Sequence, residues 1–454
     1  MTTPVKTRSK KKPLPATVQA AAPVSGPIQL SVTSEVGRLR KVMTHRPGPE
    51  VDRMAPCLMD EFLFDDILYG NTARHEHKQF CDILRLAADE VLDIETVLSE
   101  TLSDNHVRLA FIESLSSLEN LPPVMTEFLL SVPASELARL AINGIEFSPD
   151  MVEHYPSSRL PYALTPVPNL MFMRDPLVVF GPGAFLGSMA RKIRQREPLL
   201  VRYAYGYHPR LKLEEREMFY FDELPLLTLR RKIDIPGLEG GDCLVLSDKV
   251  MAVGISERTS EVAVDLLIEA LKKKTMLETV LVVLLPKQRA VMHLDTVFTQ
   301  ISQDECLVYA PMFDANGAEL LPVIRKDLRG KHVRSELVGS LLDGLRQEGL
   351  ELRPIPCGGH GDRIMQQREQ WTDGANALCL CPGVITLYER NLRTAEELSA
   401  NGYDVVMADE LLSGRAQVVL DGRHKCAILI AGHELSRARG GPRCMTMPLI
   451  RDRV

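Results

Sequence analysis

The feature that most restricts how this chain can fold is a repeated unit that starts near residue 166. Four segments share one form, an acidic residue or asparagine, an apolar strand, a short turn and a second strand, and they begin at Asp175, Asp242, Asp295 and Asn376. Two of them continue into a helical pattern and a third strand. Recurring strand–strand–helix–strand units predict an α/β ring of similar modules rather than one doubly wound sheet. In such a ring the first strands converge on an axis, which predicts that the polar residues beside them lie around one cavity.

Two parts of the chain do not follow this repeat. Residues 1–29 carry five basic residues, no acid and several prolines, a composition that predicts a disordered basic arm. Residues 96–150 are rich in Leu, Ala, Ser and Glu with apolar positions three and four apart, which predicts an insertion of several short helices. The catalytic α/β domain is therefore expected over 30–95 and 151–454.

Composition excludes several classes of protein. The formal charge is 54 − 60 = −6, which disfavours a nucleic-acid partner because phosphate binding needs a basic surface. No apolar run approaches the roughly 18 residues that a membrane-spanning helix needs. Nine cysteines, an odd number without a CxxC pair, favour reduced thiols in the cytoplasm over a disulfide scaffold.

Cys444 stands in the most informative stretch, residues 438–452. It follows Gly440 and Gly441, which allow close backbone approach, and Arg439 and Arg443 lie nearby. Neighbouring cations favour the thiolate, so Cys444 is a candidate nucleophile. From the local residues alone, a buried structural cysteine explains the pattern equally well.

His293 and Asp295 are two residues apart, a spacing that puts both side chains on one face of a strand. An imidazole beside a carboxylate is an acid–base pair, although a hydrogen-bonded core histidine fits equally well. Zinc is disfavoured because no third ligand has supporting spacing. The HEH sequence at 75–77 lies in a helical pattern where neighbours point apart, so we expect no metal there.

Glu239, Asp175 and Asp295 would give one cavity three carboxylates. Carboxylates are costly to bury without cations, so their convergence indicates a cationic ligand, for which guanidinium is the best planar match. Three arginines are candidates for the opposite end of such a ligand, although each taken alone also suits a surface salt bridge: Arg194, Arg258 and Arg439.

Eight motifs together resemble one known family. They are SEVGRLRKVM (34–43), DEFLFDD (60–66), NLMFMRD (169–175), LEGGD (238–242), GISERTS (254–260), MHLDTVF (292–298), REQWTDGAN (368–376) and RGGPRCM (439–445). Their order and spacing are similar to those of arginine deiminases, in the guanidino-group-modifying (pentein) superfamily. The resemblance implies a pseudo-symmetric propeller of five ββαβ modules with an inserted helical domain.

The resemblance also implies roles for five residues of the reaction. Cys444 matches the nucleophile, and His293 and Glu239 match an acid–base pair. Asp175 and Asp295 match the aspartates that hold the guanidinium. The implied reaction is hydrolysis of free L-arginine to L-citrulline and ammonia through a covalent cysteine intermediate, without metal or cofactor.

Four further residues match groups that bind the α-amino acid end of the substrate: Asn169, Arg194, Arg258 and Arg439. The family also implies a homo-oligomer. An amidinotransferase, in which an amine replaces water, uses the same cysteine, histidine and carboxylates and is the second enzyme hypothesis. A catalytically silent arginine-binding scaffold is the hypothesis from a different class.

Overall fold

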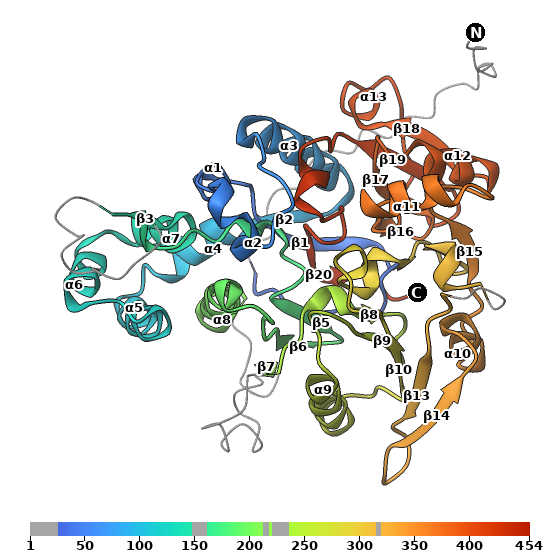
Figure 1. Cartoon of the computed structure of the whole chain (residues 1–454), viewed down its shortest axis with the longest axis horizontal. Helices are drawn as coiled ribbons and strands as arrows, with labels where there is room; N and C mark the ends of the chain where they lie inside the picture. Colours follow the sequence, from blue (N-terminus) through green and yellow to red (C-terminus); the bar gives the residue numbers. More distant parts are fainter. Residues whose placement is uncertain (1–25, 148–160, 212–217, 220–235, 315–318) are drawn as a thin grey trace.

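The computed structural model describes residues 26–147, 161–211, 218–219, 236–314 and 319–454. Most of the predicted arm, residues 1–25, lies outside this range. The described chain starts inside the core, because Ile28 is buried and its N–H donates to the carbonyl of Arg210 at 2.6 Å. The chain is a mixed α/β structure (Figure 1).

Five sheets of the described residues share one connection pattern, in which the first and second strands are antiparallel and the third runs parallel to the second. The first sheet contains β5 (Leu177–Phe180), β6 (Gly183–Leu186) and β7 (Met218–Phe219). The second contains β8 (Cys243–Val245), β9 (Val250–Ile255) and β10 (Thr279–Leu284), extended by β13 (Val323–Asp327) and β14 (Arg334–Val338). The third contains β11 (Phe298–Gln300), β12 (Glu305–Val308) and β15 (Arg353–Pro356).

The last two sheets complete the set. The fourth contains β16 (Leu378–Cys381), β17 (Val384–Tyr388), β19 (Cys426–Ile430) and β18 (Asp404–Met407). The fifth joins the two chain ends, because its first strand is β20 (Met447–Arg451) and its other strands are β1 (Leu39–Thr44) and β2 (Glu90–Asp93). The sequence repeat covers the first four sheets, and the structure adds this fifth one.

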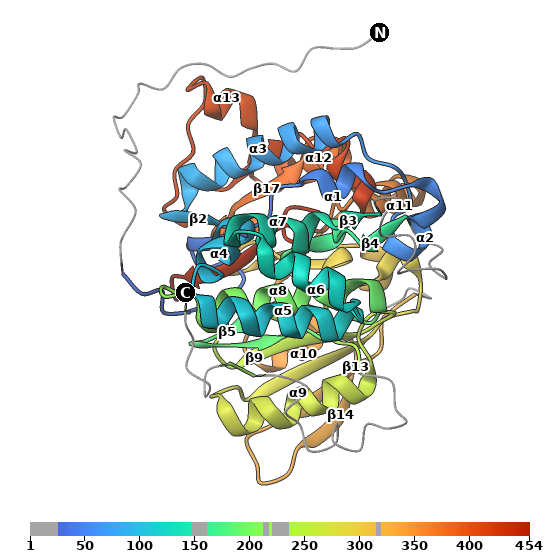
Figure 2. The same ribbon diagram turned by 90° about the vertical axis from the view of Figure 1, so that its left-hand side faces the viewer.

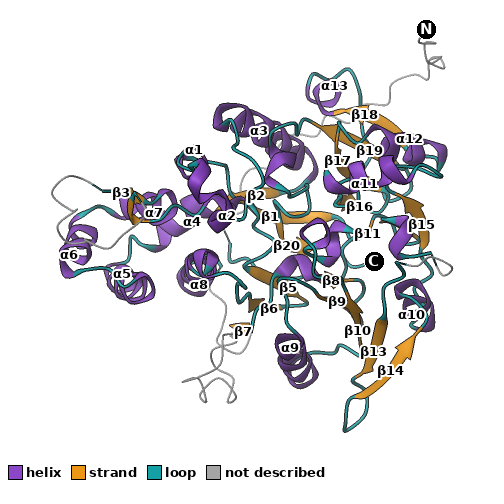
Figure 3. Cartoon of the chain, in the orientation of Figure 1, coloured by secondary structure: helices purple, strands orange, loops and turns teal. Residues whose placement is uncertain are grey.

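In each sheet, a helix lies along the chain between the second strand and a later strand that runs parallel to it. Two parallel strands need such a long connection because the chain must return to the same edge of the sheet. These helices are α8 (Arg196–Tyr207), α9 (Glu261–Lys274), α10 (Leu341–Gln347), α12 (Leu392–Ala400) and α3 (Gly70–Ala87). Figure 3 shows the helices set around the strands, which meet towards the middle of the molecule. The remaining short elements are α1 (Pro49–Asp52), α2 (Met59–Phe62), α11 (Arg363–Trp371), α13 (Ala408–Leu412), β3 (Ile145–Glu146) and β4 (Tyr162–Leu164).

Four helices occupy the span that the sequence assigned to a helical insertion: α4 (Ile94–Thr101), α5 (Asn105–Glu119), α6 (Pro123–Ser131) and α7 (Ala134–Asn143). Asp93 and Asp104 begin two of them, because each carboxylate accepts N–H groups of the first turn. The four helices gather on one side of the molecule with α8 (Figure 2). Their buried side chains, such as Leu98 and Phe111, share one apolar core with Leu200 of α8. Among the described residues, no helix combines the length and the apolar character that crossing a membrane would require.

Candidate active site

Each of the five sheets places a polar side chain just before its first strand. Asp175 precedes β5, Asp242 precedes β8, Asp295 precedes β11, Asn376 precedes β16 and Cys444 precedes β20. Several of these residues lie in or beside short 3-10 turns, including Gly240–Asp242 and Leu294–Thr296. The five strand starts therefore deliver carboxylates, an amide and a thiol to one region.

A narrow cavity of about 20 Å³ lies in this region. It is lined by Leu63, Asn169, Phe172, Asp175, Arg194, Arg258, Arg289, Met292, His293, Ala438, Arg439 and Cys444. Seven of the nine residues that the sequence singled out are in this lining, and the other two, Glu239 and Asp295, contact lining residues. The space suits one or two waters, so a larger ligand requires some of these walls to move.

Cys444 is buried beside a carboxylate. Its Sγ lies 3.5 Å from Oδ2 of Asp295, and its N–H donates to Oδ1 of Asn376 at 3.2 Å. Burial raises the pKa of the Cys444 thiol well above its usual value, and the charges of Asp295 and Asp175 raise it further. The thiol is therefore protonated while the cavity holds no positive ligand.

The predicted activation of this thiol by neighbouring arginines is only weakly present. Arg443 does lower the thiol pKa, but burial and the carboxylates outweigh it. The reason is that the Arg443 side chain turns away to other partners. Nη1 donates to Oδ2 of Asp295 at 2.7 Å, and Nη2 donates to Glu35 and to the carbonyl of Cys243.

His293 and Glu239 form a buried pair, with Nε2 of the imidazole 2.9 Å from Oε2 of the carboxylate. Burial alone would lower the histidine pKa, but the charge of Asp175 and the bond to Glu239 raise it to about 9. The Glu239 carboxyl has a pKa well below its usual range, because Arg194 and the bond from His293 outweigh its burial. At neutral pH the imidazole is thus a cation that holds a proton available for transfer.

Gly241 makes this arrangement sterically possible. A Cβ at this position would lie 2.5 Å from Nδ1 of His293 and 3.1 Å from Oδ1 of Asp175. The Gly241 N–H also donates to that Asp175 oxygen at 3.2 Å. The LEGGD motif therefore needs glycine here because the backbone itself packs against the imidazole.

Asp175 is already partly neutralised by Arg194. The Arg194 Nη2 donates to Oδ2 of Asp175 at 3.0 Å, Nη1 donates to Glu239 at 3.1 Å, and the guanidinium also holds Glu197. Arg194 was predicted to bind the α-amino acid end of a ligand; it lines the cavity, and its donors lie on three carboxylates. Its four N–H···O bonds explain how three acids can be buried so close together.

One oxygen of the Asp295 carboxylate has no hydrogen-bond partner among the described residues. Oδ2 accepts from Arg443 and lies near Cys444, whereas Oδ1 is buried and unpartnered in that part of the chain. An unpaired buried carboxylate oxygen is costly, so a donor arriving in the cavity would be stabilised there. This oxygen lies on the carboxyl group nearest to the thiol.

The other predicted binding residues line the same cavity with fewer fixed partners. Asn169 donates to the carbonyl of Phe62 at 2.7 Å. Arg258 has Nη1 3.8 Å from Glu239 and Nε 3.6 Å from Glu257, and this Nε has no hydrogen-bond partner in the described part of the chain. Arg439 donates from Nη2 to the carbonyl of Ala290 at 3.2 Å, and its Nε and Nη1 are unpartnered. Arg258 and Arg439 therefore have donors available for an anionic group.

Asp242 lies behind the cavity rather than in its lining. Its carboxylate accepts from Ser256 Oγ at 2.6 Å and from the N–H of Leu294 at 2.9 Å. These bonds tie the second sheet to the turn that carries His293 and Asp295. The acid at this strand start therefore supports the site without facing it.

Sequence reasoning gave no role to three residues of one motif, REQWTDGAN. Asn376 donates from Nδ2 to the carbonyl of Asp295 at 3.1 Å and accepts from the Cys444 N–H, so it joins the third and fifth sheets. Trp371 lies 3.5 Å from the Arg439 guanidinium, measured to the ring centroid. Asp373 is buried with both oxygens unpartnered. Asn376 starts a repeat in the sequence, which was the available signal for its position.

Asp175, Glu239 and His293 lie close enough for one ligand atom of each to meet a metal ion. Arg194 already donates to both carboxylates, and the imidazole bonds to one of them. The donor set is thus charge-balanced by a guanidinium and an imidazolium, the arrangement of an acid–base site. The HEH stretch is also engaged elsewhere, since Glu76 accepts the N–H groups of His433, Glu434 and Leu435.

Comparison with known proteins identifies the family. The family model of arginine deiminase matches residues 60–451. An arginine deiminase of Bacillus cytotoxicus is 35% identical over 444 residues, covering 94% of this chain and 99% of the relative. An arginine deiminase of Borrelia duttonii is also 35% identical, covering 94% of this chain and 98% of the relative.

A solved structure supports the fold. An amidinotransferase of Microseira wollei from the saxitoxin biosynthetic pathway superimposes with a TM-score of 0.51 at 12% identity, covering 94% of this chain and 98% of that one. At this identity the likeness concerns the fold alone. The sequence relatives, in contrast, match along nearly their full length, and the chain belongs to the arginine deiminase family.

Proposed function

We propose that this chain hydrolyses free L-arginine to L-citrulline and ammonia, with Cys444 as the nucleophile and His293 as the proton carrier. The observation that carries the proposal is the thiol of Cys444 beside Asp295, whose second carboxylate oxygen is buried and unpartnered. A guanidinium bound there would meet a carboxylate and a sulfur at once. The relatives named above support the reaction itself.

Binding is expected to place the guanidinium of arginine between Asp295 and Asp175. Oδ1 of Asp295 has no partner, and each oxygen of Asp175 has lone-pair capacity beyond its present bonds. Bidentate pairing fixes the plane of the guanidinium and brings its central carbon to the thiol. The α-carboxylate then lies toward Arg258, Arg439 and Asn169. Arg194 stays bonded to the carboxylates of Asp175, Glu239 and Glu197.

The first half of the reaction transfers the amidino carbon to sulfur. The positive charge of bound arginine offsets the carboxylates that raise the thiol pKa, so the thiol gives its proton to solvent water and the thiolate attacks the carbon. In the tetrahedral adduct, His293 gives its proton to one amino group. That group leaves as ammonia, and a thiouronium remains on Cys444.

The second half returns the enzyme to its starting state. Neutral His293, still oriented by Glu239, takes a proton from water, and the oxygen attacks the thiouronium carbon. The C–S bond breaks as the C–OH group becomes the carbonyl of citrulline, and the hydroxyl proton passes to the departing sulfur, so citrulline leaves with Cys444 again a thiol and His293 again protonated. Both halves therefore use one imidazole, first as acid and then as base.

For the fold, we propose that the five sheets are the five modules of a propeller closed around the site. Their shared connection pattern and the five strand starts at the cavity support this. The helices α4–α7 would be an insertion into the module that β20, β1 and β2 build.

We also propose a cytoplasmic homo-oligomer. All nine cysteines are unpaired, which fits a reducing compartment. Leu109, Val124, Phe128 and Leu130, on α5 and α6, expose apolar surface that a second copy would cover. Sedimentation analysis that found a monomer at micromolar concentration would argue against the oligomer.

The function is tested by measuring citrulline and ammonia from L-arginine, agmatine and peptidyl-arginine. Arginine is expected to be the preferred substrate, because the spare donors of Arg258 and Arg439 suit a free α-carboxylate. Cys444→Ala should abolish citrulline formation while calorimetry still detects arginine binding. Adding glycine together with arginine separates hydrolysis from transfer. Continued release of ammonia is expected, whereas formation of guanidinoacetate in place of ammonia would show that the chain is an amidinotransferase.

A further inference from the structure

Two complementary charged side chains near the proposed nucleophile are buried, and each has polar atoms without a hydrogen-bond partner among the residues that the structure describes. Asp373 is 1% exposed, and neither of its carboxylate oxygens is paired. Arg439 is 5% exposed, and two of its nitrogens, Nε and Nη1, are unpaired. Leaving buried ionic groups unpaired costs free energy, so pairing either group with an opposite charge would stabilise the folded chain.

The two groups already influence each other through space. Burial raises the pKa of Asp373 to about 7, and the charge of Arg439 opposes that rise. Burial likewise lowers the pKa of Arg439, and the charge of Asp373 opposes that fall. The charge of Asp373 also raises the pKa of the Cys444 thiol, although less than Asp295 and Asp175 do. Pairing Asp373 with a cation would therefore favour the thiolate.

Arg439 is held away from Asp373 by a small number of contacts. Its guanidinium stacks on Trp371 at 3.5 Å from the ring centroid, and one N–H donates to the carbonyl of Ala290 at 3.2 Å. This is a single cation–ring contact, and because Asp373 and Arg439 are both already buried, a salt bridge between them would add attraction with little further desolvation. This position can therefore give way to a salt bridge with a buried carboxylate.

The backbone also carries strain at both positions. Asp373 and Arg439 adopt left-handed conformations with φ of +63° and +65°. Among the non-glycine residues that the structure describes, Leu63 and Asn120 are the others with positive φ, and Leu63 lines the same cavity. Such conformations persist where the surrounding structure imposes them, often at sites that bind or switch.

The turn that carries Asp373 is fixed to the nucleophile. The Asp373 N–H donates to the carbonyl of Gln370, and the Asn376 N–H donates to the carbonyl of Asp373. Asn376 in turn bonds to the Cys444 N–H and to the Asp295 carbonyl. Since the backbone of Asp373 is anchored and its side chain is short, most of the movement that brings the two groups together falls on the longer Arg439 side chain.

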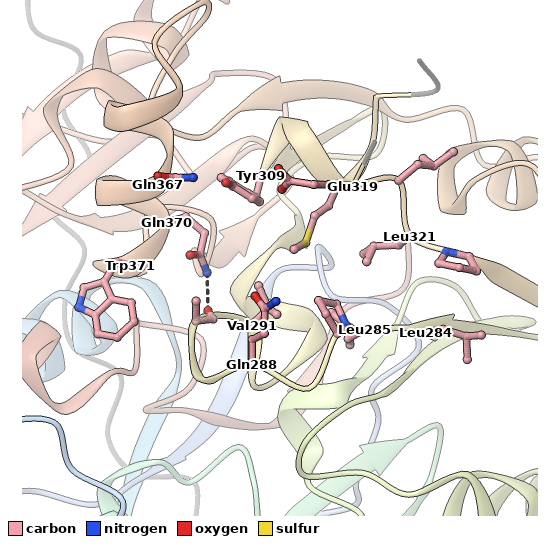
Figure 4. Close-up of a pocket in the computed structure, with 15 residues that line it drawn as sticks. Leu284, Leu285, Gln288, Val291, Tyr309, Glu319, Leu321, Gln367, Gln370 and Trp371 are labelled. Atoms are coloured by element: carbon pink, nitrogen blue, oxygen red, sulfur yellow. Dashed lines mark hydrogen bonds between the residues drawn. The ribbon is translucent and has the colours of Figure 1, made fainter. Parts of the chain in front are cut away.

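Arginine cannot enter the present cavity unless a wall residue moves. The cavity has about 20 Å³ of space, and Arg439 is part of its wall. On the far side of Arg439, Trp371 and Ala290 line a second, larger hollow of about 770 Å³. Figure 4 shows this hollow, with Trp371 and Gln370 on one side and the loop with Gln288 and Val291 beside them. Arg439 thus separates the two spaces and is the residue whose displacement would enlarge the first.

We infer that Asp373 is a positioning residue that receives one edge of the Arg439 guanidinium when arginine fills the cavity, leaving the other edge to the α-carboxylate of arginine, so that Arg439 alternates between the Trp371 ring and the Asp373 carboxylate. This inference rests on the proposed function, since it takes arginine as the ligand. It gives Asp373 no contact with substrate, because the residue acts through Arg439.

The chain provides its own reporter for this movement, because Trp371 is its single tryptophan. In a Cys444→Ala background, which binds arginine without turnover, saturating arginine should shift the emission of Trp371 to longer wavelength. The physical reason is that the ring loses its guanidinium cover and gains contact with water. Adding Asp373→Asn should abolish the shift, because Arg439 then lacks the charged partner that draws it from the ring. Asparagine tolerates the left-handed backbone, so this variant is expected to fold.

Two controls make the result specific. Asp362→Asn changes an exposed carboxylate at the other end of α11, where asparagine caps a helix equally well, and should leave the shift intact. Arg439→Met should remove it. The inference is wrong if calorimetry shows arginine bound to Cys444→Ala and the emission stays unchanged, or if Asp373→Asn keeps the full shift. Absence of citrulline production by the unaltered enzyme would instead overturn the proposed function and this inference with it.

Kinetics give an independent test. Asp373→Asn should lower kcat/KM for arginine by about 10-fold to 100-fold, whereas adding it to Arg439→Met should lower kcat/KM no further. Losses that multiply in the double variant would show that Asp373 acts independently of Arg439.

Discussion

At the scale of single residues, the proposed mechanism gives Asp295 two opposite effects on the reaction. Its charge raises the pKa of the Cys444 thiol, and its unpartnered oxygen is proposed to hold the guanidinium. On this proposal the carboxylate keeps the resting thiol protonated and also binds the cationic ligand that lowers the thiol pKa again. Removing its charge should separate the two effects.

Asp295→Asn is expected to raise KM and lower kcat for arginine, for a combined loss in kcat/KM of about 100-fold or more. At the same time the Cys444 thiol should react faster with iodoacetamide in the absence of arginine, because a charge that raises its pKa is gone. Peptide mass mapping after a timed reaction would measure that rate for Cys444 alone. Asp304→Asn, at an exposed position in the turn between β11 and β12, serves as the control. Unchanged kinetics would mean that the carboxylate does not bind guanidinium.

His293 makes a prediction about stability and pH. Its pKa is about 9 in the folded chain against 6.5 as the ordinary value, so the folded state holds one more proton than the unfolded state between these values. The stabilisation is complete below pH 6.5 and is lost as the pH rises through 9. A shift of this size corresponds to a contribution on the order of 3 kcal/mol.

Urea unfolding of the unaltered chain and of His293→Gln at pH 6.5 and pH 9 would measure this contribution. The free energy of unfolding should fall more steeply with pH in the unaltered chain, by a difference on the order of 3 kcal/mol. Equal pH slopes would show that the imidazole is not held as a cation in the native state.

At the scale of elements, the site is built from the starts of strands, and the sequence revealed this for four sheets. Asp175, Asp242, Asp295 and Asn376 were recognisable because each precedes an apolar run and a turn. The fifth start, before β20, was not recognisable as part of the repeat, since its partner strand β1 lies some four hundred residues away. Pairing between chain ends leaves no local pattern.

The groups that the charged residues contact could not be predicted from the sequence either. Arg194 and Arg443 were read as cations near a ligand or a thiol, but each forms bonds with buried carboxylates. Asp242 was expected around the cavity, and its carboxylate accepts the N–H of Leu294, in the turn next to His293, without lining the cavity. A charge is visible in a sequence, whereas the atom that it contacts depends on tertiary packing.

The Gly240–Asp242 turn leads to a further prediction. Gly241→Ala should lower kcat for arginine by about 10-fold to 100-fold, because the new methyl group would displace the imidazole of His293. KM should change much less, since the α-amino acid end of the site lies on other elements. Gly330→Ala, where the nearest atom to a new Cβ is 3.4 Å away, is the matched control. Steady-state kinetics on both variants would decide, and normal kcat in Gly241→Ala would show that the turn adapts.

At the scale of the whole molecule, the helices α4–α7 are not packed as a separate domain. Their buried residues belong to one core with Leu30, Val179, Leu200 and Met447. The sequence predicted the helical character of this span correctly from its periodicity, but it gave no information on what the helices pack against. Their apolar faces complete the core that the first and fifth sheets share.

Replacing residues 96–143 by a short Gly-Ser linker is therefore expected to destabilise the rest of the chain severely, by exposing the apolar surface of α8 and its neighbours. Thermal unfolding followed by circular dichroism should show loss of the cooperative transition. Removing residues 1–25 is the comparison, and that chain should keep its melting temperature and its kcat, because the catalytic groups lie between Asn169 and Cys444. A folded, active enzyme without the helices would contradict the shared core.

The pairing of β20 with β1 has a consequence for synthesis on the ribosome. The ribosome makes β1 some four hundred residues before it makes Cys444 and β20. Until then β1 has no β20 to pair with, and the growing chain already contains Asp175, Glu239 and Asp295 but not the Cys444 thiol. On the proposed mechanism, the nascent polypeptide therefore cannot consume arginine, one of the building blocks of its own synthesis, before Cys444 has been added.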